Sequence, residues 1–363
     1  MMNLNNRIEA FAKLGDFLKA LIKNDFQVLP LTKLNDFCAN GQELDRLQQE
    51  IIDYYQHSVH YNAWFTQEYL LFAISDWAKA LNIKSLLDWT AKYQLNRDIE
   101  IKTIGVVMAG NLPLVGFHDY LSVLISGHRI LAKLSSDDAI LLPLLHRVLA
   151  VIDSGFADHA SFTQGQMKNF DAIIATGSDN TARYFQYYFG KYPNIIRKNR
   201  SGVAVITGHE TEEQLKALTV DILAYFGLGC RSVSKLFIPD GYEFRPLFEI
   251  LESSNHLANH SKFFNNYEYS KAIYLVNRDM HRDTGFLLFK EDVAMSSPIA
   301  VVYYESYQDI KLLKKTLETR KEEIQCIIGD DKQQFAYGQS QHPSLSDYAD
   351  GVDTIAFLMS LSA

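Results

Sequence analysis

The sequence changes character at Ile101-Lys-Thr-Ile-Gly-Val-Val-Met-Ala109, where helical patterning gives way to a short apolar run typical of a buried strand. A helical pattern from about Leu114 to Ser126 follows it, and then a second strand-like run from Arg129 to Leu134. Strands and helices in alternation indicate parallel βαβ units. This stretch therefore predicts an α/β fold built on a doubly wound sheet.

The alternation continues to the end of the chain, whereas the residues before it are helical. Up to about residue 95 the apolar residues, such as Ile8, Phe11 and Leu14, fall on one helical face, which predicts a helical N-terminal layer. Four further helices are predicted: one capped by Asp137 or Asp138 that ends near Ile152, one at 179–189, one that begins with a capping box at Thr211–Gln214, and one at 307–324. Further strands are predicted at 171–176, 203–207, 233–238, 272–277, 299–304 and 325–328.

Composition excludes several classes of function. With 363 residues, 47% hydrophobic and 21% charged, the chain is long enough for two domains with cores of their own. A net charge of −8 argues against nucleic-acid partners and anionic membranes. Its three cysteines lack metal-binding spacing, and no apolar run could span a bilayer. We expect a cytoplasmic protein without metal, disulfide framework or stable membrane insertion.

Cys230 is the first candidate for catalysis. It lies in Tyr225-Phe-Gly-Leu-Gly-Cys-Arg-Ser-Val-Ser-Lys-Leu-Phe-Ile-Pro239, where a helix gives way through two glycines to a polar turn and a strand. Gly227 and Gly229 permit positive φ and close backbone approach. Arg231 places a cation beside a sulfur that must be a thiolate to react. The alternative interpretation is a buried structural thiol.

Asn111 is the second candidate, in Val106-Val-Met-Ala-Gly-Asn-Leu-Pro-Leu-Val-Gly116. An amide at the carboxyl end of a strand can point into the cleft where open α/β sheets bind their ligands. It donates hydrogen bonds without carrying charge, which suits an oxyanion. The alternative is a helix cap.

Lys133 ends the strand Arg129-Ile-Leu-Ala-Lys-Leu-Ser-Ser136, and Ser135 and Ser136 follow it. A lysine at a strand end can hold a nucleotide ribose or phosphate. The alternative is a surface lysine whose stem lies on apolar residues.

A third strand end reads Asp171-Ala-Ile-Ile-Ala-Thr-Gly-Ser178. Ser178 or Asp179 can cap the next helix, whose N-terminal amides favour anions. A plain cap without a ligand explains the same residues.

In this order and spacing the four segments resemble the aldehyde dehydrogenase superfamily, and more closely its fatty acyl-CoA reductase branch, which supplies aldehyde for bacterial luminescence. The resemblance covers about residues 100–363. It implies that Cys230 is the acyl-accepting nucleophile and that Asn111 is the oxyanion-hole amide. The implied cofactor-binding residues are Lys133, Ser135, Ser136, Thr176, Gly177 and Ser178.

The fold that follows is aldehyde dehydrogenase-like, with two doubly wound α/β domains and a helical N-terminal layer. Residues 1–204, with a C-terminal return at 331–363, are expected to form the helical layer and a Rossmann-like cofactor-binding domain. Residues 205–330 are expected to form the catalytic domain. A homo-oligomer is possible, since relatives commonly form dimers or tetramers.

Three departures from the superfamily pattern bear on the reaction. The stretch Arg197-Lys-Asn-Arg-Ser-Gly202 lacks the glutamate that activates water in hydrolytic members, so water attack would lose about 10²–10⁴ in rate. Ala294-Met-Ser-Ser-Pro298 lacks the glutamate that precedes Phe-Gly-Pro, and Glu291 lies three residues early. Ser136 replaces an acidic ribose ligand, which favours NADPH over NADH because a 2′-phosphate is not repelled.

These features predict an acyl-CoA reductase that converts a fatty acyl thioester to an aldehyde with NADPH, or with NADH as the second option. The substrate is an acyl-CoA or another acyl thioester. Three alternatives stay open: an NAD(P)-dependent aldehyde dehydrogenase, an acyltransferase or thioesterase without cofactor, and a silent acyl-binding scaffold.

Overall fold

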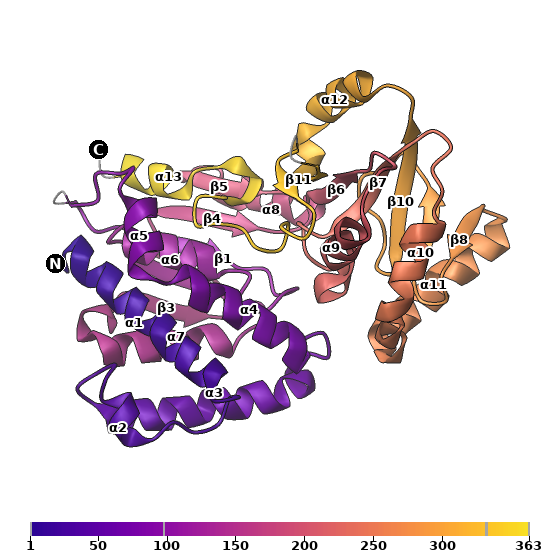
Figure 1. The fold of residues 1–363 in the computed structure, drawn as a ribbon. Coiled ribbons are helices and arrows are strands. Elements are labelled where there is room, and N and C mark those ends of the chain that lie inside the picture. Colours follow the sequence, from indigo (N-terminus) through magenta and orange to yellow (C-terminus); the bar gives the residue numbers. More distant parts are fainter. Residues whose placement is uncertain (1, 97–98, 331–332, 362–363) are drawn as a thin grey trace. The chain divides into compact units, whose positions relative to one another are not determined.

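The computed structural model describes residues 2–96, 99–330 and 333–361. The chain forms two compact units, Met1–Lys198 with Ser344–Ala363 and Asn199–Pro343, and each has its own sheet (Figure 1). The boundary expected after residue 204 falls inside a strand, Ser201–Val205, which pairs within the second sheet. The return to the first unit begins at Ser344.

The first unit is built around a parallel sheet with the strand order β3-β2-β1-β4-β5. Its strands are β1 (Thr103–Val107), β2 (Arg129–Lys133), β3 (Ala160–Thr163), β4 (Ala172–Thr176) and β5 (Asn194–Arg197). Its helices are α1 (Leu4–Lys23), α2 (Leu31–Leu34), α3 (Gly41–Tyr61), α4 (Gln67–Ala80), α5 (Ile83–Thr90), α6 (Phe117–Ile125), α7 (Leu141–Ile152), α8 (Asp179–Phe189) and α13 (Thr354–Ser360), with short 3-10 turns η1 (Ser154–Phe156) and η5 (Ala349–Gly351).

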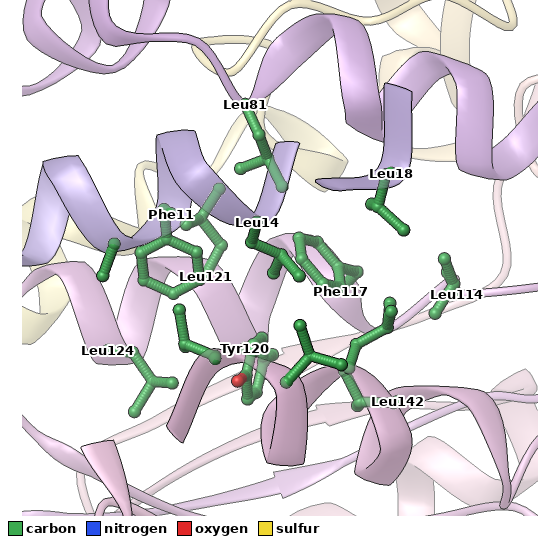
Figure 2. Packing of buried hydrophobic residues seen from close by; sticks show 14 of the residues in the cluster. Phe11, Leu14, Leu18, Leu81, Leu114, Phe117, Tyr120, Leu121, Leu124 and Leu142 are labelled. Atoms are coloured by element: carbon green, nitrogen blue, oxygen red, sulfur yellow. The ribbon is translucent and has the colours of Figure 1, made fainter. Parts of the chain in front are cut away.

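The helical layer expected at the N-terminus is present, and its apolar face forms the main core. α1 packs against α4, α6 and α7. Figure 2 shows Phe11 and Leu14 of α1 interleaved with Phe117 and Leu121 of α6. All four side chains are fully buried, and such burial contributes about 1.5–3 kcal/mol per side chain.

The second unit has a seven-stranded sheet with the order β12-β11-β6-β7-β10-β9-β8, parallel except for the β8–β9 pair. Its strands are β6 (Ser201–Val205), β7 (Val233–Pro239), β8 (His281–Asp283), β9 (Leu288–Glu291), β10 (Val301–Tyr307), β11 (Ile324–Gly329) and β12 (Phe335–Ala336). Its helices are α9 (Glu212–Leu223), α10 (Arg245–Leu251), α11 (Ser261–Asn277) and α12 (Ile310–Thr319), with 3-10 turns η2 (Ala224–Gly227), η3 (Glu252–Asn259) and η4 (Lys321–Glu323). The predicted capping box of Thr211 and Gln214 begins α9.

Two predicted details are wrong. Residues 272–277 are not a strand but the end of α11, because Phe263, Tyr267 and Tyr274 recur at helical spacing and are buried on one face. Neither Asp137 nor Asp138 caps α7. That helix follows Ile140, and the Asp138 carboxylate instead accepts a hydrogen bond from a neighbouring loop.

Candidate functional site

The predicted nucleotide-binding residues of the first unit follow the ends of three adjacent strands. β1 lies between β2 and β4, and Val107 at its end is paired with Lys133 on one side and Ala175 on the other. The chain leaves β1 toward β2 and later returns to the other side of β1 as β4. The carboxyl end of β1 is therefore a topological switch point, the place where open α/β sheets bind ligands.

The loop from Met108 to Gly116, which carries Asn111, is held at its base. The Met108 amide donates to the Lys133 carbonyl at 3.0 Å. A Cβ on Gly116 would collide with the Met108 side chain, so glycine allows the two ends of the loop to meet. A Cβ on Gly110 would likewise collide with Ser135. Small residues thus bring the loops after β1 and β2 into contact.

Asn111 differs from its alternative interpretation as a helix cap, whereas Lys133 still fits its alternative, a lysine whose stem lies on apolar residues. Asn111 is exposed and does not cap α6, whose N-cap residue is Gly116. Lys133 is half-buried and forms no ion pair with the described residues. A cation in that setting is available to an anionic or hydroxyl-bearing ligand.

The turn after β4 has the geometry of a helix N-terminus. Ser178 is the N-cap of α8, and its hydroxyl accepts from the Thr181 amide at 3.3 Å. A Cβ on Gly177 would lie 3.0 Å from Phe185 and Thr181, so only a very small residue lets the chain pass this close to α8. The exposed amides at such a helix start favour a phosphate group.

Cys230 lies in the second unit, in the turn between α9 and β7, at the amino end of β7. It is exposed, so the alternative of a buried structural thiol does not hold for this residue. A Cβ on Gly202 of β6 would collide with the carbonyl oxygens of Arg231 and Ser232. Gly202 therefore lets the turn pack tightly against the sheet.

An unusual backbone precedes this turn. Tyr225 and Phe226 have φ values of 53° and 58°, and Gly227 has 74°, so three successive residues are left-handed. Gly227 accepts this at little cost, as its position in the sequence predicts. Phe226 is held by ring contacts with His260 at 4.2 Å and Phe263 at 5.7 Å between centroids.

A second cysteine of the same unit lies close by but has a different character. Cys326 is fully buried on β11, and its Sγ donates toward the Arg231 carbonyl at 3.7 Å. Burial raises the pKa of the Cys326 thiol to about 12, against a weaker lowering by Arg231. The Arg231 guanidinium itself lies over the Phe335 ring at 5.3 Å. Cys326 is thus an inert thiol, in contrast to exposed Cys230.

A small hollow lies beside the Cys230 turn. The sequence contains no indication of this hollow. Phe226, Gly227 and Val233 line it together with residues 297–302. The Ala294–Pro298 stretch reaches this place because the Ser234 hydroxyl donates to the Met295 carbonyl at 2.8 Å. The hollow holds about 20 Å³, roughly one water, so an acyl chain would have to displace its walls.

A larger hollow of about 400 Å³ lies at the opposite, carboxyl ends of β6 and β7. Residues 207–210 and 239–243 line much of it. Its Glu210 carboxylate already accepts hydrogen bonds from Thr207, Gly208 and Tyr337. Cys230 precedes β7, so this hollow is separate from the thiol.

Arg197, the first residue of the 197–202 stretch that lacks the expected glutamate, has a structural role. Its guanidinium forms two hydrogen bonds with Asp119 of α6, at 2.6 and 2.9 Å, and one with Thr354 of α13. The pair is almost completely buried and ties the C-terminal segment to β5 and α6. The 197–202 stretch contains no carboxylate.

The predicted residues therefore fall into two groups. The first unit brings together the ends of β1, β2 and β4, with Asn111, Lys133, Ser135, Ser136 and Thr176-Gly177-Ser178. Cys230 belongs to the second unit. The roles of all these residues, including the pairing of Asn111 with Cys230, are proposals taken up below.

No family model and no curated protein matches the sequence. Several solved structures are nevertheless similar to the fold of this chain. An aldehyde dehydrogenase from Bacillus cereus is similar with a TM-score of 0.57 and 13% identity, over 90% of this chain and 71% of that one. An aldehyde dehydrogenase from Physcomitrella patens, in complex with its reaction product succinate, gives 0.58 and 13% over 100% and 85%.

An indole-3-acetaldehyde dehydrogenase from P. syringae, in complex with NAD⁺, gives a TM-score of 0.58 at 11% identity, over 90% of this chain and 72% of that one. At such identities the likeness concerns the fold. The chain has an aldehyde dehydrogenase-like α/β fold, as the sequence predicts.

Two further findings concern only the part of the chain that the structure describes. There, no helix is both long and apolar enough to cross a membrane. Within residues 2–96, 99–330 and 333–361, His, Cys, Asp and Glu side chains do not gather in a group that could hold a metal ion.

Proposed function

We propose that this protein is an acyl-CoA reductase, which converts an acyl thioester, such as a fatty acyl-CoA, to an aldehyde. The observation that carries the proposal is the exposed Cys230 thiol, shortly after a strained backbone segment, in an aldehyde dehydrogenase-like fold. Such strain is typical of functional segments. The fold alone hosts related oxidoreductases, so the choice of reaction rests on the residues.

In the first half of the reaction the Cys230 thiolate attacks the thioester carbonyl carbon. From the resemblance to the superfamily, we propose Asn111 and the Cys230 backbone N–H as the donors to the tetrahedral oxyanion. The bond to the coenzyme A sulfur breaks, and coenzyme A leaves as a thiolate that takes up a proton. Cys230 now carries the acyl group as a thioester. Thiol–thioester exchange needs no added base, because both partners are good leaving groups.

The residues at the ends of β1, β2 and β4 fit a dinucleotide. Gly177 lets the chain after β4 pass close to α8, Ser178 starts a helix that favours phosphate, and Lys133 lacks a described ion-pair partner. When bound, NADPH supplies the hydride that reduces the acyl group. Cys230 then leaves as a thiolate while the aldehyde forms, and the enzyme regains its starting state.

Reduction is favoured over oxidation of an aldehyde because the expected water-activating carboxylate is absent. Arg197, the first residue of the 197–202 stretch, is locked in its pair with Asp119. An acyl-enzyme would therefore be hydrolysed slowly, and a thiol would be its better acceptor. NADPH is favoured over NADH since Ser136, which is exposed, offers no charge to repel a 2′-phosphate.

Incubation with acyl-CoAs of graded length tests the proposal. Intact-protein mass spectrometry should detect an acyl adduct without cofactor, and NADPH should then be oxidised as aldehyde appears. Cys230→Ser should lose the adduct yet still bind NADPH in a fluorescence titration, with Cys326→Ser as the matched control. Wild-type rates of acyl-CoA-dependent NADPH oxidation in Cys230→Ser would refute the assignment.

An aldehyde dehydrogenase is the second candidate, favoured by the solved structures that share the fold. It predicts that an aldehyde with NAD⁺ or NADP⁺ gives the free acid, with no dependence on coenzyme A. The same assays distinguish the two reactions, because only a reductase releases coenzyme A from the acyl substrate.

A further inference from the structure

Asp138 is a buried carboxylate that none of the steps above uses. It lies between β2 and α7, with 7% of its surface exposed. One oxygen, Oδ2, accepts the backbone N–H of Leu114 at 2.9 Å. Leu114 lies three residues after Asn111, in the same loop.

Leu114 has an unfavourable backbone that needs support. Its φ of 58° is left-handed, which for a non-glycine residue costs about 1–2 kcal/mol. Its side chain is buried in the same cluster as Leu18, Phe117 and Leu142 (Figure 2). The Asp138 bond fixes the backbone at the same point. The end of the Asn111 loop is thus anchored twice, once by packing and once by a charge.

The second Asp138 oxygen, Oδ1, is buried and has no hydrogen-bond partner among the described residues. Tyr54 of α3 is buried nearby, and the Asp138 charge is among the causes that raise the pKa of Tyr54. Tyr61 acts on Tyr54 in the same direction, and Asp137 precedes Asp138 on the surface. Among the described residues no cation forms an ion pair with the carboxylate, and burial raises its pKa to about 7.

We propose that Asp138 is the positioning residue of the Asn111 loop, and that it holds the Leu114 backbone in the conformation that presents the Asn111 amide. The consequence for activity rests on the function proposed above. Asp138 touches neither substrate nor cofactor, and it acts only through the loop. An ionised carboxylate accepts the Leu114 N–H more strongly than a protonated one. As long as Asp138 stays buried, its bond to Leu114 is therefore stronger above pH 7 than at pH 6, whereas global unfolding, which hydrates the carboxylate, becomes easier over the same range.

Backbone hydrogen exchange at Leu114 tests the anchor without reference to activity. Asp138→Ala should lower the protection factor of this amide at least tenfold at pH 8. Asp138→Asn keeps a carbonyl acceptor and should preserve protection within about threefold, but protection should no longer depend on pH around 7. Asp137→Asn, on the exposed neighbour, is the matched control and should behave as wild type.

Kinetics provide the second measurement. Asp138→Ala should lower kcat for acyl-CoA reduction about tenfold or more at an unchanged KM for NADPH, and Asp138→Asn should restore most of it. Unchanged Leu114 protection in Asp138→Ala would overturn the proposal. If Asp138→Ala does not fold, Asp138→Asn gives the test: the proposal is overturned if protection of the Leu114 amide in this variant still depends on pH around 7. If wild type lacks reductase activity while exchange responds as expected, the proposed function fails and the anchor stands.

Discussion

Alkylation of the native protein should single out Cys230 among the three cysteines. A thiol reacts as its thiolate, and an ordinary exposed cysteine is about a quarter ionised at pH 8. Burial raises the pKa of Cys326 to about 12, so that about one molecule in 10⁴ carries the thiolate at this pH. Relative to an ordinary exposed cysteine, the ionised fraction of Cys326 is thus lower by about 10³, and its zero exposure slows its reaction further.

The assay is brief treatment with iodoacetamide at pH 8, followed by peptide mass spectrometry. Cys38, which is also buried and whose pKa burial raises, is a control in the first unit. All three cysteines should react in denaturant. Prior incubation with an acyl-CoA should protect Cys230. Labelling of Cys326 in the native protein at a rate near that of Cys230 would refute this view of the two thiols and remove the main support for the nucleophile.

Four further outcomes follow from the structure. Lys133→Ala should raise the KM for NADPH up to about tenfold at little change in kcat, and an unchanged KM would remove Lys133 from the cofactor site. Gly202→Ala should lower the free energy of unfolding, measured in urea, by about 1–3 kcal/mol, since its Cβ meets two carbonyl oxygens of the Cys230 turn. Arg197→Met should lower it by about 3–5 kcal/mol, because Asp119 is left buried and unpaired; a loss below 1 kcal/mol would contradict the role of this pair. Asp138 has a folded-state pKa above its unfolded value, so the folded protein binds the proton more tightly than the unfolded chain. The free energy of unfolding should therefore fall by roughly 4 kcal/mol in total as pH rises from about 4 to 7. This decrease should be absent in Asp138→Asn.

The sequence was sufficient for the fold because the central strands, such as β1 and β4 of the first sheet and β6 and β7 of the second, are buried, largely apolar runs. β1, β4 and α8 lie where periodicity predicts them, and the capping box at Thr211 starts α9. Where prediction failed, a longer pattern or a distant partner decided the structure. In α11 the apolar run after residue 271 resembles a strand when it is considered alone. The buried positions earlier in the helix, Phe263 and Tyr267, continue to Tyr274 at helical spacing and show that the run is helical.

The site is less visible in the sequence, since its support comes from contacts between segments far apart in the chain. The polar residues at strand ends could be found by their type and position. Nothing in the sequence around Asp138 shows that it binds the Leu114 amide, 24 residues away, instead of starting a helix. Equally, only the structure shows that Arg197 is committed to Asp119, 78 residues away.

Two buried aromatic residues stabilise the unusual backbone that precedes the exposed Cys230 thiol. Tyr225 and Phe226 end α9 in a left-handed conformation that costs about 1–2 kcal/mol each. Their side chains are 8% and 3% exposed, and burial of one large aromatic side chain offsets that cost. The left-handed pair and Gly227 therefore end the helical course after α9, and the chain continues through the exposed Cys230 turn into β7.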